Sequence, residues 1–217
     1  RITKGAAKAL LGKAILFQNN TARMGEAATL FEEVINSNVY ALEKMCAKYL
    51  PPHKFVCLTD MELECETIPL LHDWVGWWAK MELFRLPSAL YFDLDTVLTG
   101  DCTAMIEAAK QHDFVIMRDV YRGQYNPKAM QSSMMYWSKY VDLYDKFAAL
   151  QMYAAGGDQS YIEHHMRDKV TYWQDIADGI VSFKADVLPK GLDDAKVVIF
   201  HGKPRPWEQT RIPYEIG

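Results

Sequence analysis

The chain has 217 residues, of which half are hydrophobic and 24% are charged, as expected for one substantial globular domain. Its 28 acidic side chains outnumber 24 basic ones and leave a net charge of -4. This balance argues against a nucleic-acid partner, because binding to a phosphate backbone needs a basic surface.

The N-terminal region predicts two helices. Helix-forming and apolar residues recur at helical spacing over 3–18 and again over 24–35, and the polar run Asn36-Ser37-Asn38 is expected to end the second helix. Together they predict an αα-hairpin of tetratricopeptide type, which cannot bury its apolar face alone. We therefore assign residues 1–39 to a helical hairpin and residues 40–217 to a second domain.

From residue 40 onward, short apolar strands alternate with helices. A short helix over 40–49 is expected to end before Pro51-Pro52, and another over 74–86 before Pro87. Strands are predicted at 54–58, 89–92, 114–117, 131–137, 170–173, 180–183 and 197–200, and further helices at 102–110, 138–150 and 156–166. The alternation predicts an α/β fold, a mostly parallel sheet flanked by helices.

Two carboxylates follow the apolar strand over 89–92. Asp93 and Asp95 are separated by one residue, so an extended backbone would direct both to the same side. Converging carboxylates repel each other unless a cation or proton lies between them, and oxygen ligands of this kind suit Mg²⁺ or Mn²⁺. A surface turn with two solvated acids explains the same spacing equally well.

Residues 40–208 resemble GT-A-fold glycosyltransferases of the glycogenin/galactosyltransferase group, glycosyltransferase family 8 and its relatives. The resemblance is carried by the ordered blocks FVCLTD, GWWAKMELFR, YFDLDTVLTGD, QSSMMYW, GGDQSYI and VIFHGKPRPW. It implies transfer of a sugar from a nucleotide-sugar donor, expected to be a UDP-sugar, to an unknown carbohydrate, lipid or protein acceptor.

The resemblance also implies roles for individual residues. Asp93, Asp95 and His201 match the residues that bind Mn²⁺ (or Mg²⁺), and Asp158 with Gln159 matches the Asp-Gln pair beside the reacting sugars. The implied substrate-binding residues are Lys80, Asp60, Ser132, Ser133 and Lys203. Asp158 could instead cap a helix, Lys80 could be a solvated helix charge, and His201 alone could be a packed histidine.

A second resemblance covers the N-terminus. The run KGAAKALLGKAILFQNN…EAATLFEEVINSNVYAL, in residues 1–42, resembles the tetratricopeptide-type helices of SusD/RagB-like glycan-binding lipoproteins. It stands where GT-A domains have the first strand, which helps to hold the nucleotide. We therefore expect a GT-A-like domain that lacks this strand, with an unpaired sheet edge and an incomplete nucleotide pocket.

Two other functions remain open on sequence grounds. One is a non-catalytic glycan-binding or helical interaction protein, which the N-terminal hairpin favours. The other is a phosphatase of haloacid-dehalogenase type, in which Asp93 would be the nucleophile and Asp95 the general acid.

Cysteine usage and hydropathy suggest a location. The four cysteines show no Cys-x-x-Cys pairing, which is typical of reduced thiols, and no apolar run is long enough to span a bilayer. We therefore expect a cytoplasmic protein with no transmembrane segment.

Overall fold

The computed structural model describes residues 23–150, 156–212 and 214. This part combines helices with three small β-sheets, which confirms the predicted α/β class. The helix expected over 3–18 lies outside the described residues. None of the described helices is long and apolar enough to cross a membrane.

The strands are short and are connected mostly by helices and helical turns. They are β1 (Cys57–Thr59), β2 (Thr67–Pro69), β3 (Ala89–Phe92), β4 (Thr96–Leu98), β5 (Phe114–Arg118), β6 (Met130–Trp137), β7 (Thr171–Tyr172), β8 (Ile180–Ser182) and β9 (Val197–Ile199). The helices are α2 (Met24–Tyr49), α3 (Thr103–Ala109), α4 (Leu143–Leu150), α5 (Gly157–Met166), α6 (Trp173–Ile176) and α7 (Leu188–Lys190). Shorter helical segments are the 3₁₀ helices η2 (Gly76–Arg85), η3 (Arg122–Gln124) and η5 (Pro206–Glu208) and the π-helical turn η4 (Phe183–Val187).

The sheets are mixed rather than mostly parallel. In the described chain, the largest sheet has the order β3-β6-β5-β7, and β6 runs antiparallel to both of its neighbours. A second sheet, β4-β9-β8, has one antiparallel and one parallel pair, whereas β1 and β2 form a separate parallel pair. The direction of β6 follows from its connection to β5, because residues 119–129 turn back directly and a parallel strand would need a longer crossover.

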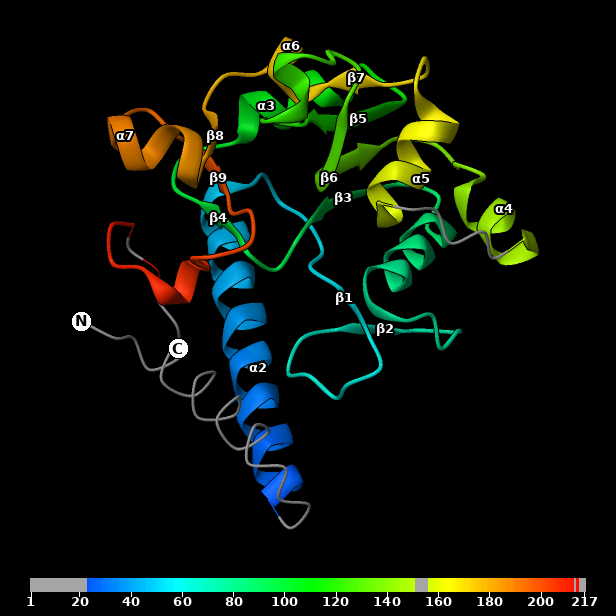
Figure 1. Ribbon diagram of the computed structural model, residues 1–217, viewed down its shortest axis with the longest axis vertical. Coiled ribbons are helices and arrows are strands. Elements are labelled where there is room, and N and C mark those ends of the chain that lie inside the picture. Colours follow the sequence, from blue (N-terminus) through cyan, green and yellow to red (C-terminus); the bar gives the residue numbers. More distant parts are fainter. Residues whose placement is uncertain (1–22, 151–155, 213, 215–217) are drawn as a thin grey trace.

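The first described helix is longer than the sequence suggested. α2 continues without interruption through Asn36-Ser37-Asn38, where the sequence predicted a break and a separate short helix over 40–49. Asn38 is buried, and its side-chain oxygen accepts a hydrogen bond of 2.8 Å from Tyr214. That contact satisfies a polar group that would otherwise disfavour a helix interior. The expected boundary between residues 39 and 40 therefore lies inside α2, which extends from beneath the sheets in Figure 1.

Strand β6 carries polar side chains into the core of the large sheet. Gln131, Ser132 and Ser133 are each at least nine-tenths buried, in a strand whose other buried members are apolar. The β5–β6 register shifts at this point, so residues 132–134 have no partner on β5. On the other side the Asp93 N–H donates to the Ser133 carbonyl at 2.8 Å. Such irregularities redirect side chains and are frequent beside functional sites.

Candidate active site

A lysine lies between two carboxylates at the end of β3. Lys80 Nζ, from η2, is 2.8 Å from Asp93 Oδ1 and 3.3 Å from Asp158 Oδ2. The side chains of all three are largely buried, with 13%, 26% and 9% exposed. Burial by itself would lower the pKa of Lys80, but the two carboxylates outweigh it and raise this pKa. Lys80 is therefore a cation at neutral pH.

Two hydroxyl groups complete this cluster. Ser132 Oγ donates to Asp158 Oδ2 at 2.8 Å and accepts from Lys80 Nζ at 3.1 Å. Tyr91 donates its hydroxyl proton to Asp93 Oδ1 at 2.5 Å, and burial, together with the nearby carboxylates, raises the pKa of Tyr91 well above its usual value. Tyr91 was not predicted as a site residue, although its place two residues before Asp93 is a signal that could have found it.

The start of α5 is shaped by two glycines. Gly156 and Gly157 both have positive φ, of 99° and 76°, which places Asp158 in the first turn of the helix. A Cβ on Gly157 would come within 2.5 Å of the Trp77 ring nitrogen. Glycine is thus required both by the backbone conformation and by the close approach of Trp77.

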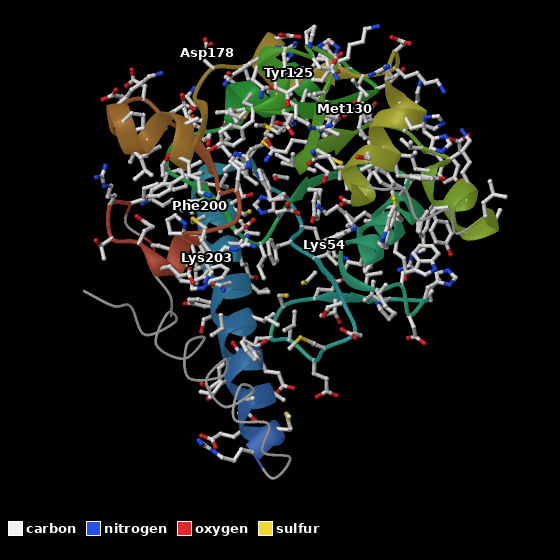
Figure 2. All side chains as sticks on the ribbon, in the orientation of Figure 1. Lys54, Tyr125, Met130, Asp178, Phe200 and Lys203 are labelled. Atoms are coloured by element: carbon white, nitrogen blue, oxygen red, sulfur yellow. The ribbon has the colours of Figure 1, made fainter. Side chains whose placement is uncertain are left out.

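The second predicted carboxylate faces a different cation. Asp95 forms an ion pair and hydrogen bond with the Arg205 guanidinium, and its side chain is 12% exposed. The sequence prediction chose Lys203 as the basic group of the HGKPRPW block and did not include Arg205. Lys203 is exposed on the segment that follows β9 (Figure 2). Its role in substrate binding stays a prediction.

His201 lies near the start of the same segment, and one of its ring nitrogens has no hydrogen-bond partner among the described residues. Its Nδ1 is 2.8 Å from Gln131 Nε2, whereas Nε2 is buried without a hydrogen-bond partner among the described residues. Gln131 Nε2 also donates to Ser133 Oγ at 3.0 Å, and Gln131 Oε1 is likewise unpartnered. Burial lowers the pKa of His201, so the ring is neutral at pH 7.

A third group of charges lies beside this histidine. Gln159 Nε2 donates to Asp119 Oδ2 at 3.2 Å, and Asp119 also accepts from Arg122 Nε at 2.9 Å. Burial opposes ionisation of Asp119, but its hydrogen bonds to Arg122 and Tyr121 prevail and lower its pKa. The sequence prediction did not include Asp119 or Arg122. The adjacent Arg118-Asp119 at the end of β5 was a signal that could have found Asp119.

Asp60 stands apart from these groups. It is exposed directly after β1, and no hydrogen bond or ion pair joins it to Lys80, Asp93 or Asp158 within the described chain. The structure therefore brings together Lys80, Ser132, Asp93 and Asp158, and separately Gln131, Ser133 and His201.

The predicted metal ligands do not come together as a cation-binding group in the described part of the chain. Among residues 23–150, 156–212 and 214, no three His, Cys, Asp or Glu side chains form a group that could hold a metal ion. Asp93 and Asp95 are each paired with a basic side chain, whereas His201 Nε2 has no hydrogen-bond partner in the part of the chain that the structure describes. Two carboxylates and an imidazole suit Mn²⁺ by their chemistry, but a cation would have to displace Arg205 from Asp95.

Comparison with known proteins supports the fold. No protein-family model matches the chain, and no curated protein matches it. The crystal structure of the glycosyltransferase GlyE from Streptococcus pneumoniae TIGR4 is similar, with a TM-score of 0.55 and 13% sequence identity. The match covers 81% of this chain and 54% of that chain, so the present chain corresponds to about half of the GlyE structure. At this identity the likeness shows a shared fold.

Proposed function

We propose that this chain transfers a sugar from a nucleotide-sugar, a UDP-sugar, to a carbohydrate, lipid or protein acceptor. The observation that carries the proposal is the buried Lys80 held between Asp93 and Asp158, in a fold shared with a glycosyltransferase. Burying two carboxylates around one lysine is costly for stability, and such arrangements concentrate at functional sites.

The polar groups of this cluster suit the two halves of a nucleotide-sugar. Asp158 and Ser132 can accept hydrogen bonds from sugar hydroxyls, because each retains acceptor capacity beyond its present partners. Lys80 supplies a fixed positive charge that attracts the phosphates and stabilises charge on the departing diphosphate. Tyr91 holds Asp93 in place through its short hydrogen bond.

We further propose that the donor binds together with Mn²⁺ or Mg²⁺, held by Asp93, Asp95 and His201. The cation would neutralise charge on the diphosphate. Its binding would require the Gln131 amide to turn, so that Gln131 Oε1 accepts a hydrogen bond from the Nδ1–H of the neutral His201 ring. A lone pair on His201 Nε2 would then be free for the cation. Cation binding also requires Arg205 to leave Asp95, after which its guanidinium can contact a phosphate.

The test is a thermal-unfolding titration with UDP, with and without Mn²⁺. We expect a rise in Tm that needs both, that is lost in Asp95→Asn, and that persists in the control Asp178→Asn, which lies on an exposed loop (Figure 2). Release of UDP from UDP-hexoses would then establish turnover. If no nucleoside diphosphate stabilises the chain at millimolar concentration, or if the chain hydrolyses phosphate esters, the proposal is wrong.

A non-catalytic glycan-binding function is the second candidate, and one observation favours it. The Trp77 side chain is 62% exposed, although it packs against the glycine turn that precedes Asp158. Exposed aromatic rings stack on the apolar faces of sugars. Binding of free oligosaccharide without UDP or metal, abolished in Trp77→Ala, would support this candidate over sugar transfer.

A further inference from the structure

Strands β8 and β9 leave their sheet at the same end. They are parallel and lie side by side in Figure 1, and their register pairs Ser182 with Ile199. The next residues, Phe183 and Phe200, therefore lie opposite each other. Their rings are stacked, with centroids 4.4 Å apart and an angle of 15° between the planes. The two segments that follow, the turn η4 and the segment that begins with His201, thus start as neighbours.

Lys184 directly follows the stacked ring of η4 and faces the segment after β9. A Cβ added to Gly202 would be 3.8 Å from Lys184 Nζ. Burial is the main cause of the lowered pKa of His201, and the Lys184 ammonium lowers this pKa further, against the opposite effects of Asp119 and Asp93. The Lys184 ammonium therefore lies beside His201, at the edge of the candidate site.

The turn that carries this lysine is firmly held. Ser182 is fully buried, its N–H donates to Asp186 Oδ2 at 2.9 Å, and its Oγ accepts from Ala185 N–H at 3.2 Å. The first and last residues of η4 are buried in the core. π-helical turns are rare and occur frequently at functional sites. The backbone is thus fixed on both sides of Lys184, whose side chain is only partly buried.

Lys184 differs from the other partly buried cations around the site, because it lacks a counterion. Lys80 is paired with two carboxylates, Arg122 with two and Arg205 with one. In the described part of the chain, no carboxylate lies within ion-pair distance of Lys184 Nζ. A partly buried ammonium is stabilised when an anion supplies the missing countercharge. The position therefore suits an anionic group of a ligand.

We propose that Lys184 binds the phosphate groups of the nucleotide-sugar donor. The proposal rests on the sugar-transfer function proposed above and adds a residue that lies outside the sequence blocks with site residues. An ammonium group is a compact charge on a flexible stem, and it can follow the oxygens of a diphosphate. Arg205 would have to break an ion pair to reach a phosphate, whereas Lys184 is available without such a loss.

The test is protection of lysine amines from acetylation in the whole 217-residue chain. The protein is treated with sulfo-N-hydroxysuccinimide acetate in the presence of Mn²⁺, and each lysine is followed by mass spectrometry. With UDP at about ten times its Kd, we expect acetylation of Lys184 to slow about tenfold, because only the unbound protein then exposes this amine. Uridine, which carries no phosphate, should give no protection.

Lys190 is the internal control for this experiment. It lies six residues further along the chain, at the end of α7, and its side chain is 71% exposed. Its only ion pair in the described chain is with Asp186 on the surface. Acetylation of Lys190 should therefore proceed at the same rate with and without UDP.

Substitutions test the same contact through affinity. Lys184→Met should raise the Kd for UDP about tenfold, which corresponds to about 1.4 kcal/mol. Lys184→Arg keeps the positive charge and should retain most of the affinity, and Lys190→Met, with the same loss of charge, should bind UDP as the native chain does. The acetylation experiment needs no variant, so it stands even if Lys184→Met does not fold.

The outcomes separate this proposal from the function proposed above. If UDP binds but neither protects Lys184 nor loses affinity in Lys184→Met, this proposal alone is wrong. Equal protection of Lys184 by uridine, or by sulfate at the same concentration as UDP, would also overturn it, because the contact would then not be with the donor phosphates. If UDP does not bind at millimolar concentration, the proposed function and this proposal both fail.

Discussion

Lys80 holds the candidate site together electrostatically. Its ammonium group contacts Asp93 and Asp158 and also bonds to Ser132, so one side chain connects η2, the end of β3, the start of α5 and β6. η2 and β3 are neighbours in the sequence, whereas β6 and α5 come much later in the chain, and each element contributes one polar group to Lys80 or is the element that carries it. A solvated helix charge, the alternative for Lys80 on sequence grounds, does not describe a side chain that is 13% exposed.

We expect Lys80→Met to destabilise the protein by about 3 kcal/mol, because it leaves two buried carboxylates without their cation. The measurement is urea-induced unfolding at pH 7.5. Lys110→Met is the matched control, since Lys110 pairs with Glu107 on the surface and its loss should leave the midpoint unchanged. An equal midpoint for Lys80→Met and the native chain would show that the cluster contributes nothing to stability.

At the scale of single elements, α2 and α5 show what local patterns miss. The polar run Asn36-Ser37-Asn38 indicates a helix end by propensity, yet α2 continues through it because Asn38 bonds to Tyr214 near the other end of the chain. α5, in contrast, begins where its Gly-Gly-Asp start predicted, because glycine's conformational freedom is a local property.

Tyr214→Phe should lower the free energy of unfolding by about 2 kcal/mol, because the buried Asn38 oxygen loses its donor. Thermal or urea unfolding measures this loss. Asn38→Leu removes the side-chain oxygen that accepts this hydrogen bond. In that background, adding Tyr214→Phe should change the free energy of unfolding very little. If the two substitutions add independently, the hydrogen bond is not what stabilises this region of α2.

Gly157→Ala is expected to cost about 2 kcal/mol, since alanine is strained at a φ of 76° and its Cβ meets the Trp77 ring. Gly25→Ala provides the opposite control, because Gly25 lies in α2 and no neighbouring atom of the described residues comes within 4 Å of the added Cβ, and this variant should gain about 0.5 kcal/mol. Both are read from urea midpoints. Equal effects at the two positions would refute the argument from backbone conformation.

At the scale of the whole molecule, the core consists of three apolar clusters, and the site lies where polar residues interrupt the sheet. All four cysteines are free thiols, and burial raises the pKa of Cys46 to about 12 and that of Cys102 to about 11. These thiols therefore stay protonated, as expected for packing residues.

Stability should fall as the solution becomes acidic. Burial lowers the pKa of His201, and burial together with His164 lowers that of His165, below their usual value of 6.5. The unfolded chain therefore takes up these protons first as pH drops below about 6.5, and the folded state loses stability until the lower folded-state pKa is passed. Between the two pKa values, the free energy of unfolding falls by at most about 1.4 kcal/mol per pH unit for each of these histidines.

Urea midpoints between pH 8 and pH 5 test this expectation. They should be constant above about pH 7 and fall below it, and the double variant His165→Gln, His201→Gln should flatten the curve. A native chain that becomes more stable between pH 7 and pH 5 would contradict the direction of both pKa shifts.

The sequence by itself determined the local features: the α/β class, the approximate positions of most strands, the acid pair after β3 and the glycine turn before Asp158. These follow from periodicity and backbone preference, which act over a few residues. Only the tertiary structure decided the strand directions and the partners of each charge. Lys80 meets Asp158, and Asp95 meets Arg205, across long stretches of chain, and no local preference encodes which distant groups a fold will bring together.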